Sequence, residues 1–394
     1  MQKPIYLDNN ATTPCAPEVV DAMLPYFTQQ CGNPSSIHSL GLQAQLAVTK
    51  ARESMASFLG CDSSEIFFTS GATESNNQVL LTCPSADERR RGIIVSAVEH
   101  KSVLVPAQAL SELGIAVQKL PVDAGGRVLL ESLKDIVNES IYLVSVQAAN
   151  NEVGTLQPIQ EIAEYAHSQG VLVHCDATQL LGRKSFDLYE LGVDYASFSA
   201  HKVYGPKGVG ALFVRQGNPR RNLSPLLRGG GQEAFLRAGT LNVPGIVGFA
   251  AACSVAQNRI APDTLKLTQL RDHLEKTMLE SIAEATVNGD LINRLPGTTS
   301  ITIPGVQAET LIANIPNICI SGGSACSEGT VSPSHVLIAM GLSRERAECT
   351  VRIGIGRYNS QTEIDLACTS LVAVVEKLRN ASGESCENEE RKTQ

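Results

Sequence analysis

Short apolar runs alternate with helical patterns over roughly the first half of the chain. Six runs rich in β-branched and aromatic residues predict strands at 66–70, 92–97, 141–146, 171–177, 195–200 and 208–214. Helical patterns lie between several of them, as at 101–114 and at 158–170, which opens with proline and closes with glycine. This alternation is typical of a mostly parallel sheet covered by helices.

After about residue 244 the pattern changes to long helical stretches. Three short strand candidates follow them, at 299–303, 317–321 and 350–355, with helices between. This predicts a second, smaller α+β domain. The last residues, 381–394, are polar and charged, and their composition predicts a disordered tail.

Composition narrows the class of protein. The chain has 394 residues, of which 43% are hydrophobic, so it can bury a large core and is not a small binding module. The net charge of −8 and the lack of a basic stripe argue against a direct nucleic-acid partner. The N-terminus lacks a signal peptide and no apolar run is long enough to span a membrane, so we expect a soluble, cytoplasmic protein without membrane association.

The 11 cysteines are an odd number and show no CxxC pairs or Cys/His ligand spacing. We therefore expect reduced thiols and no metal site. Cys326 differs from a buried thiol because it stands in "ISGGSACSEGT" (320–330), a stretch of small polar residues. From this stretch alone the thiol is either incidental or held out to react.

Polar groups follow several of the predicted strands, at the edge where ligands bind in open α/β sheets. After 66–70, the residues Gly71, Ala72 and Thr73 open a helix, whose free N–H groups and hydroxyl could hold a phosphate or merely cap the helix. Asp176 directly follows a buried strand, so it either meets a cation or caps the next helix. His100 follows another strand in the same way.

The segment "SFSAHKVYGPKGVG" (197–210) places Ser199, His201 and Lys202 after one more strand. Such a lysine is usually a solvated surface charge, but in a crevice opposite phosphate donors it can capture an aldehyde cofactor as a Schiff base. Phosphate donors, an acid for a pyridinium, an imidazole and an amine together describe a site for pyridoxal 5′-phosphate.

The chain resembles the pyridoxal-phosphate-dependent cysteine desulfurases, of the NifS/IscS-like type within the class-V aminotransferase family. The motifs that carry the resemblance run from about residue 5 to about 375: "YLDNNATTP", "NPSSIH", "FTSGATESNN", "EHKSV", "NNEVG", "DATQ", "SFSAHKVYGPKG", "GGGQE", "RAGT", "SGGSAC" and "RIGIGR". The segment around Cys326 resembles the long-loop group rather than the selenocysteine-lyase-like group. Departures from the usual motifs are Asn10, where alanine is common, and Gly322 and Gly354, where serine is usual.

The resemblance implies fold type I, with a mostly parallel seven-stranded sheet in a large domain at 18–255. The small α+β domain would comprise 1–17 and 256–380 and carry the cysteine loop at about 320–332. The implied protein is a homodimer, with a site completed across the interface.

The same resemblance assigns the cofactor residues. Lys202 would form the Schiff base, His100 would stack on the ring and act as acid or base, and Asp176 would pair with the ring nitrogen. The residues implied at the phenolic oxygen are Gln179 and Asn151. Those implied at the phosphate are Thr73, Ser199, His201 and, from the neighbouring subunit, Thr240.

Arg352 is implied to bind the carboxylate of the substrate L-cysteine, assisted by Asn33. Cys326 would take the sulfur as a persulfide, leave L-alanine, and pass the sulfur to an acceptor protein. Iron–sulfur cluster assembly, tRNA thiolation, DNA phosphorothioation and cofactor synthesis all remain open as destinations. A selenocysteine lyase, C–S lyase or aminotransferase is the alternative; an aminotransferase or C–S lyase of this fold would share the site up to Lys202 without needing Cys326.

Overall fold

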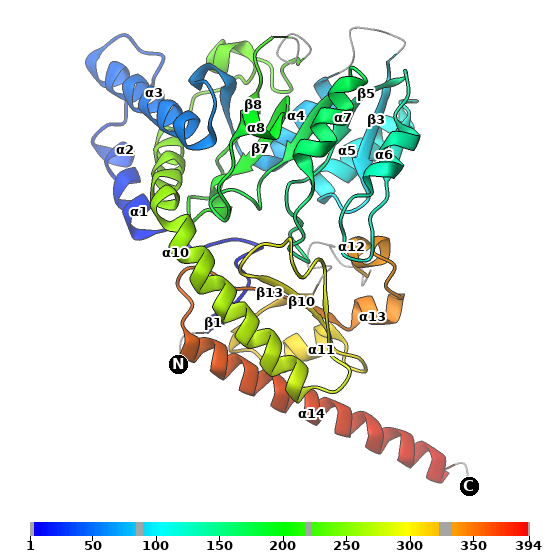
Figure 1. Ribbon diagram of the computed structural model, residues 1–394. Coiled ribbons are helices and arrows are strands. Elements are labelled where there is room, and N and C mark those ends of the chain that lie inside the picture. Colours follow the sequence, from blue (N-terminus) through cyan, green and yellow to red (C-terminus); the bar gives the residue numbers. More distant parts are fainter. Residues whose placement is uncertain (1–3, 84–89, 218–222, 323–332, 393–394) are drawn as a thin grey trace.

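The computed structural model describes residues 4–83, 90–217, 223–322 and 333–392. A larger body built on a seven-stranded sheet lies above a smaller body built on a four-stranded sheet, and one long helix, α10 (Val243–Ser281), runs through both (Figure 1). The α/β fold class with a second, smaller unit is confirmed. The domain boundaries at residues 17 and 255 stay predictions.

The large sheet has the strand order β2-β8-β7-β6-β5-β3-β4. Neighbouring strands are parallel except that β8 is antiparallel to both β2 and β7. The strands are β2 (Ile66–Thr69), β3 (Gly92–Ser96), β4 (Val117–Leu120), β5 (Ile141–Ser145), β6 (Leu172–Asp176), β7 (Tyr195–Ser199) and β8 (Gly210–Val214). Six of them match the predicted runs. The strand that was not predicted is β4, which lies half-exposed at the sheet edge. Its residues, Val-Gln-Lys-Leu, do not form a continuous apolar run.

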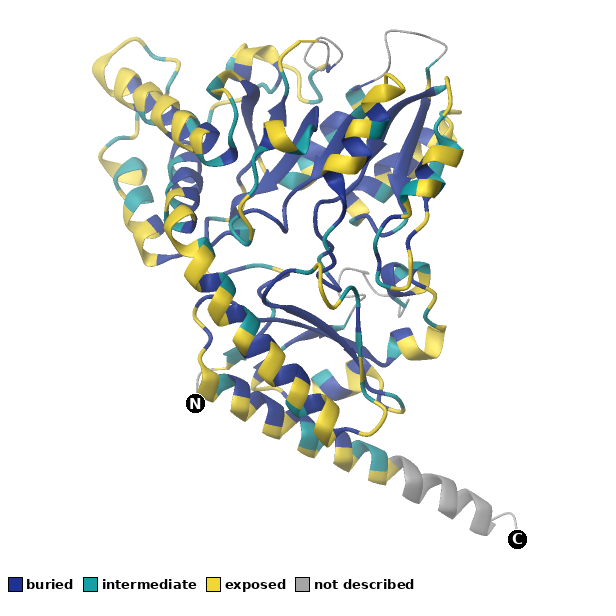
Figure 2. Cartoon of the chain, in the orientation of Figure 1, coloured by how far each residue is buried: buried dark blue, intermediate teal, exposed yellow. Residues whose placement is uncertain are grey.

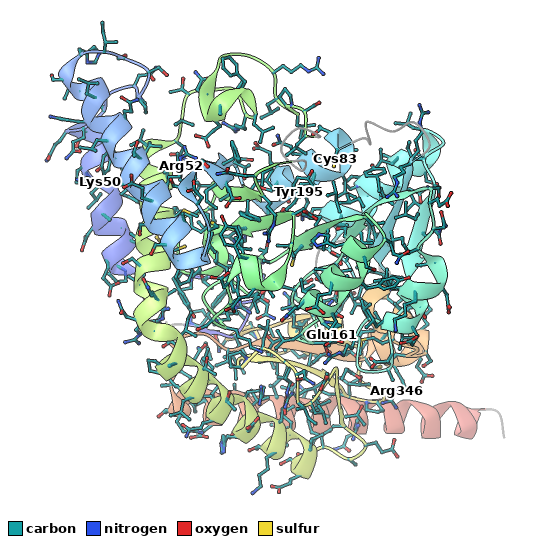
Figure 3. All side chains as sticks on the ribbon, turned by 45° about the horizontal axis from the view of Figure 1, so that its top comes forward. Lys50, Arg52, Cys83, Glu161, Tyr195 and Arg346 are labelled. Atoms are coloured by element: carbon teal, nitrogen blue, oxygen red, sulfur yellow. The ribbon has the colours of Figure 1, made fainter. Side chains whose placement is uncertain are left out.

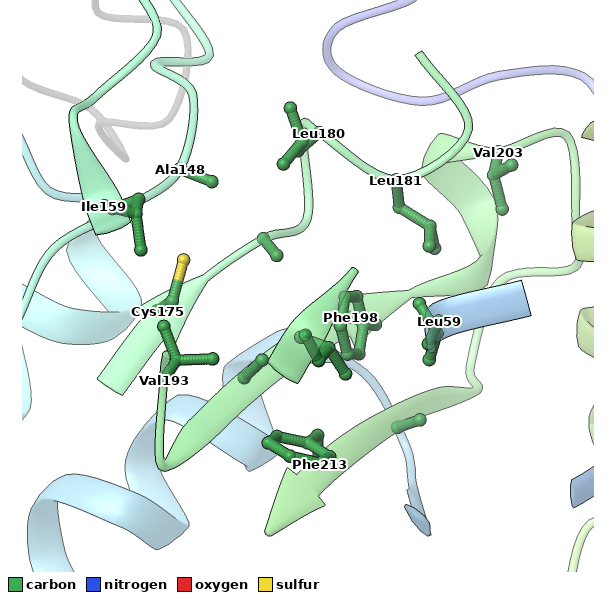
Figure 4. Packing of buried hydrophobic residues seen from close by; sticks show 14 of the residues in the cluster. Leu59, Ala148, Ile159, Cys175, Leu180, Leu181, Val193, Phe198, Val203 and Phe213 are labelled. Atoms are coloured by element: carbon green, nitrogen blue, oxygen red, sulfur yellow. The ribbon is translucent and has the colours of Figure 1, made fainter. Parts of the chain in front are cut away.

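Helices cover this sheet and bury it almost completely (Figure 2). The helices of this body are α1 (Pro17–Met23), α2 (Pro25–Thr28), α3 (Ser39–Leu59), α4 (Ala72–Thr82), α5 (Lys101–Glu112), α6 (Leu130–Ile136), α7 (Ile159–Ser168) and α8 (Leu188–Leu191). Of these, α1 and α2 pack mainly against α10. The core between sheet and helices contains Leu59, Cys175, Phe198 and Phe213, all fully buried (Figure 4). Buried parallel strands need such apolar cover on both faces.

Some polar side chains inside this body pair with one another. Figure 3 shows Cys83 and Tyr195 side by side, and the Cys83 Sγ lies 3.3 Å from the Tyr195 hydroxyl oxygen. Burial raises the pKa of the Cys83 thiol to about 11, so this cysteine is an inert structural group.

The small sheet is antiparallel, in the order β12-β13-β10-β9. Its strands are β9 (Thr286–Asn288), β10 (Thr298–Thr302), β12 (Ser321–Gly322) and β13 (Thr350–Gly354), and the parallel pair of β1 (Ile5–Tyr6) and β11 (Ile318–Cys319) lies beside it. Further helices are α11 (Ala308–Ala313), α12 (His335–Ala339), α13 (Arg344–Glu348) and α14 (Gln361–Lys392); short 3-10 turns occur at Ser63–Glu65, Ala200–Lys202 and Gln232–Phe235.

Helix α10 joins the two cores. Its first half packs against α1 and α3, and its second half packs against α14. The sequence pattern indicates two helical stretches here, but the helix continues through Pro262. Side chains of α12, among them Val336 and Leu337, belong to the core of the large sheet although they fall within 256–380.

Helix α14 continues to Lys392, where the composition of 381–394 predicts a disordered tail. The segment is rich in Glu, Lys and Arg, which favour helices, and lacks proline, and this accounts for the helical backbone. None of the helices in the described ranges has the length and apolar character needed to cross a membrane.

Candidate active site

A cavity of about 560 Å³ lies at the carboxyl ends of the parallel strands, where the N-terminal segment and β13 of the small sheet close it. Most of the predicted site residues line it: Ala72, Thr73, His100, Asn151, Asp176, Gln179, Ser199, His201, Lys202 and Arg352. Asn33 and Thr240 do not line it and are exposed. Cys326 lies outside the described residues.

Lys202 ends a short turn after β7 and lines the cavity together with Lys207 and Arg352. Its Nζ donates to the carbonyl oxygens of Asn10, at 2.5 Å, and Ala11, at 2.8 Å. Burial, followed by the positive charges of Arg183 and Arg352, lowers the pKa of Lys202 from 10.5 to about 7. A large share of the amine is therefore neutral at physiological pH, and a neutral amine is the form that attacks an aldehyde.

Asp176 is the last residue of β6 and is 7% exposed. Its Oδ2 accepts a hydrogen bond from the Asn76 side-chain amide at 2.8 Å, and its Oδ1 accepts one from the Thr178 backbone N–H at 3.0 Å. The carboxylate thus caps the turn that follows β6 and also faces the cavity, and its pairing with a cation stays a prediction.

His100 forms the N-cap of α5. Its Nδ1 accepts the Ser102 backbone N–H at 3.1 Å and lies 2.8 Å from the Ser102 hydroxyl oxygen. Burial lowers the pKa of His100, although the Asp176 charge raises it. The imidazole is therefore neutral at physiological pH and is held at its Nδ1 edge.

The N-terminus of α4 forms one wall, with Gly71 as its N-cap and Ala72 and Thr73 beside it. Gly210 of β8 faces Gly71, and a Cβ on Gly210 would lie 2.5 Å from the Gly71 Cα. The two glycines let the backbone turn here and leave N–H groups at the helix terminus, which bind anions. Ser199 also lines this part of the cavity.

His201 stands beside this wall, with its Nδ1 3.1 Å from the Thr12 hydroxyl oxygen. Burial and then the charges of Lys202 and Lys207 lower the pKa of His201 to about 4, so the ring is neutral and can donate one hydrogen bond. Lys207, which was not predicted, adds a positive charge to the lining.

Gln179 donates from Nε2 to the Asn10 carbonyl oxygen at 3.0 Å. Its Oε1 is buried and has no hydrogen-bond partner within the described part of the chain. The backbone oxygen of Asn151 accepts the Asn10 side-chain amide at 3.0 Å and the Arg352 Nη1 at 3.3 Å. A buried amide oxygen without a donor is an open position for a ligand group.

Arg352 lies on β13 with a nearly buried side chain. Its Nη2 is paired with the Asp8 carboxylate at 2.8 Å, and the Ser321 hydroxyl donates to the same oxygen at 3.1 Å. The guanidinium therefore faces the cavity while it is held by an anion of its own chain. Binding of a substrate carboxylate by Arg352 stays a prediction.

Two buried glutamates lie behind the cavity wall. Glu99 accepts the Gln147 backbone N–H at 2.6 Å, and burial followed by the Asp176 charge raises its pKa well above the usual value. Glu152 lies 2.5 Å from the Ser334 hydroxyl oxygen, and burial raises its pKa to about 7. Ser334 begins α12, so this contact ties α12 to the large body.

Several residues of the site lie within the quoted motifs, but the sequence predicts no role for them. Asn10 bonds with Asn151, with the Thr298 hydroxyl at 3.0 Å and with the Arg183 guanidinium at 3.2 Å. Asn76 and Ser102 hold Asp176 and His100. The only signal for Asn10 is its departure from the alanine that is common there.

These groups match the chemistry of pyridoxal phosphate. A helix N-terminus with Thr73 and Ser199 suits a phosphate, the Asp176 carboxylate suits a protonated ring nitrogen, and the near-neutral amine of Lys202 suits the aldehyde. The volume of the cavity also leaves room for an amino acid beside such a cofactor.

The comparison with known proteins agrees with this chemistry. The aminotransferase class-V family matches residues 5–366. The cysteine desulfurase IscS of Rickettsia massiliae (strain Mtu5) is 41% identical over 381 residues, which cover 96% of this chain and 93% of that protein.

Two solved structures are similar throughout. A NifS-like protein superposes with a TM-score of 0.89 at 40% identity and covers 95% of this chain and 99% of its own. A structure of SspA in complex with cysteine superposes with a TM-score of 0.79 at 34% identity and covers 90% of this chain and 100% of its own. The chain therefore belongs to the class-V aminotransferases, which depend on pyridoxal phosphate, and within them to the cysteine desulfurases.

Proposed function

We propose that the protein converts L-cysteine to L-alanine and transfers the sulfur to Cys326 as a persulfide. The C–S bond of the substrate breaks, an S–S bond to the Cys326 thiolate forms, and a proton replaces sulfur on the substrate carbon, so no external oxidant or reductant is needed. The buried amine of Lys202 in one cavity with Asp176 and His100 supports the cofactor chemistry, and the similarity to cysteine desulfurases supports the choice of reaction.

Each residue has a distinct task in this proposal. Bound pyridoxal phosphate supplies the electron sink for the bond-breaking steps. Asp176 keeps the ring nitrogen protonated, since a carboxylate beside it stabilises the charged form. Lys202 would hold the aldehyde group of the cofactor, and its amine, with a pKa lowered to about 7, could take and return the proton of the substrate Cα.

The remaining residues bind and orient. Thr73, Ser199 and His201 would hold the phosphate, and Gln179 and Asn151 would approach the phenolic oxygen. Arg352 would bind the substrate carboxylate after its exchange with Asp8, which lies 2.8 Å away in the structure. Arg352 is suited to this because its planar fork forms two parallel hydrogen bonds to a carboxylate.

We also propose a homodimer in which Thr240 acts across the interface and the site that includes Asn33 is completed by the second chain. Both are exposed and neither lines the cavity of its own chain. Apolar side chains lie exposed near Asn33, including Phe27 at 59%, Ile37 at 94% and Leu42 at 53%. Exposed apolar side chains of this size are typical of surfaces that another chain covers.

The acceptor of the persulfide sulfur is proposed to be a protein, in iron–sulfur cluster assembly or in another thiolation pathway. Incubation of the persulfide form with candidate acceptors, followed by mass spectrometry of the sulfur on each, distinguishes these destinations. A cytoplasmic location remains a prediction from the sequence.

The decisive experiment incubates the purified yellow protein with L-cysteine and follows alanine and sulfane sulfur. Wild type should form both, and Cys326→Ala should form neither. Equal alanine formation by Cys326→Ala would remove the desulfurase assignment, pyruvate and sulfide in place of alanine would identify a C–S lyase, and faster turnover of L-selenocysteine than of L-cysteine would identify a selenocysteine lyase. Lys202→Ala should fold normally but lose the visible absorbance of the bound cofactor.

A further inference from the structure

A chain of three hydrogen bonds leads from Asp176 to His100 through two side chains for which the proposed reaction has no task. The Asn76 amide nitrogen lies 2.8 Å from the Asp176 Oδ2 and 2.8 Å from the Ser102 hydroxyl oxygen. The Ser102 hydroxyl in turn lies 2.8 Å from the His100 Nδ1. These residues come from β6, α4 and α5, so three elements meet at this chain.

The direction of every proton in the chain follows from the chemistry of its ends. An ionised carboxylate only accepts, so the amide of Asn76 must turn its nitrogen toward Asp176. That nitrogen only donates, so the Ser102 oxygen accepts its second hydrogen and is left with its own proton to give. The neighbouring atom that can receive this proton is the His100 Nδ1.

A second contact leads independently to the same state of the ring. The Ser102 backbone N–H donates to the His100 Nδ1 at 3.1 Å. A backbone N–H can never accept, so Nδ1 must present a lone pair. In a neutral imidazole the proton then lies on Nε2. Burial, which lowers the pKa of His100, keeps the ring in this neutral form.

Burial makes these bonds hard to replace with water. Asn76 is 0% exposed and Ser102 is 7% exposed. Rotating the Asn76 amide would place its Oδ1 against the Asp176 carboxylate oxygen, which has no proton to donate, and would move the nitrogen to the buried position where Oδ1 now has no partner within the described residues. The orientation of Asn76 is therefore the only one of the two that this site tolerates.

We propose that Asn76 and Ser102 are positioning residues that connect Asp176 to His100 and hold the imidazole as the Nε2–H tautomer. His100 then meets the cavity as a hydrogen-bond donor. Because Nδ1 already receives two donors and Nε2 already carries a proton, the resting ring has no free site to take a proton from a substrate thiol. The sequence leaves open whether His100 acts as an acid or as a base. This geometry favours the acid, a ring that donates a proton or hydrogen bond from Nε2.

The tautomer is measurable in the holoenzyme without turnover. In protein labelled with ¹⁵N-histidine, the two-bond ¹H–¹⁵N spectrum at pH 7.5 distinguishes a protonated Nε2 from a protonated Nδ1, and His100→Gln assigns the signal. Wild type should show the Nε2–H pattern. An Nδ1–H pattern, or a charged ring at this pH, would overturn the proposal.

Three variants test the roles of the positioning residues. Ser102→Ala removes one donor to Nδ1 and should raise the Nδ1–H fraction about five-fold, because a hydrogen bond of this kind contributes roughly 1 kcal/mol. Asn76→Ala leaves the Ser102 hydroxyl free to rotate and should shift the same signal in the same direction by a smaller factor. Ser111→Ala, on an exposed site of the same helix, should change nothing.

An unchanged His100 spectrum in Ser102→Ala, in protein whose circular dichroism shows a native fold, would contradict the assigned role of Ser102. The effect on turnover rests on the proposed function, and in Ser102→Ala we expect about a ten-fold loss of kcat for alanine formation with little change in KM. The tautomer does not depend on turnover, so a protein inactive with L-cysteine would refute the proposed function and leave this test intact.

Discussion

The low pKa of Lys202 depends partly on Arg183, a guanidinium of the same chain that lies behind the cavity. Arg183 donates to the Asn10 side chain at 3.2 Å and to the Asn9 carbonyl oxygen at 3.0 Å. Lys202 donates to the carbonyl of the same Asn10. The two cations thus share one asparagine, and the charge of Arg183 disfavours a second positive charge on Lys202.

The free energy that disfavours the charged amine of Lys202 follows from the size of its pKa shift. A fall from 10.5 to about 7 corresponds to about 5 kcal/mol against the charged amine of Lys202. Burial is the largest cause and Arg183 the second. Replacing Arg183 by methionine, which keeps an apolar stem but not the charge, should therefore raise the pKa of Lys202 by roughly one unit, or about 1.4 kcal/mol.

The assay is the rate at which apoenzyme recombines with pyridoxal phosphate, followed by visible absorbance between pH 6 and 10. Only the neutral amine reacts, so the rate should rise with pH to a midpoint near 7 in wild type and near 8 in Arg183→Met. At pH 7 the neutral fraction should fall from about one half to about one tenth.

Two controls separate charge from packing. Arg183→Lys keeps the positive charge and should keep the wild-type midpoint. Lys184→Met removes an exposed charge from the next residue and should also leave the pH midpoint of the recombination rate unchanged. A midpoint that stays near 7 in a folded Arg183→Met protein would refute the electrostatic account of Lys202.

Three further predictions concern stability. In the native state the pKa of Glu152 is raised from 4.5 to about 7. Between these two values the unfolded chain loses the proton while the native state keeps it, so the free energy of unfolding falls as the pH rises, by about 3 kcal/mol in all. Glu152→Gln should therefore raise Tm more at pH 8 than at pH 5, whereas exposed Glu161→Gln should not; an equal gain at both values would contradict this. Asn10→Ala leaves buried donors unpaired and should lower the free energy of unfolding in urea by about 1–3 kcal/mol, and no loss would show that Arg183 finds other partners. Gly210→Ala should lower Tm and weaken cofactor binding, because its Cβ would overlap the backbone before α4; an unchanged Kd for pyridoxal phosphate would count against the tight contact.

The sequence predicted the parts of the site that follow apolar runs. Asp176, His100 and Lys202 each come at or just after a buried strand or its turn, and parallel strands bring such positions to one edge. The pattern of β4 was missed because an edge strand with glutamine and lysine has no apolar run. Helix α10 was split in two because Pro262 interrupts its pattern, although neighbouring helices support it from both sides.

The residues that sequence reasoning missed act through contacts between distant segments. Ser102 and Asn76 look like ordinary helix residues until α4 and α5 are packed together. Arg183 looks like a surface arginine in "LLGRKS", and its role appears only when the N-terminal segment is laid beside it. Spacing within a motif carries no information on such neighbours. For Cys326, the sequence remains the sole source of its assignment.

The N-terminal strand β1 and the residues after it belong to a wall completed by the far end of the chain: the Asn9 side chain donates to the Gly354 carbonyl oxygen across 345 positions at 2.9 Å. This segment leaves the ribosome before its partners: Gln179, Arg183 and Lys202 follow midway along the chain and Gly354 only much later, so the wall stays incomplete until most of the chain has been translated. We therefore expect that a nascent chain still lacking the segment around Gly354 cannot complete this wall and should bind the cofactor less tightly than the full chain.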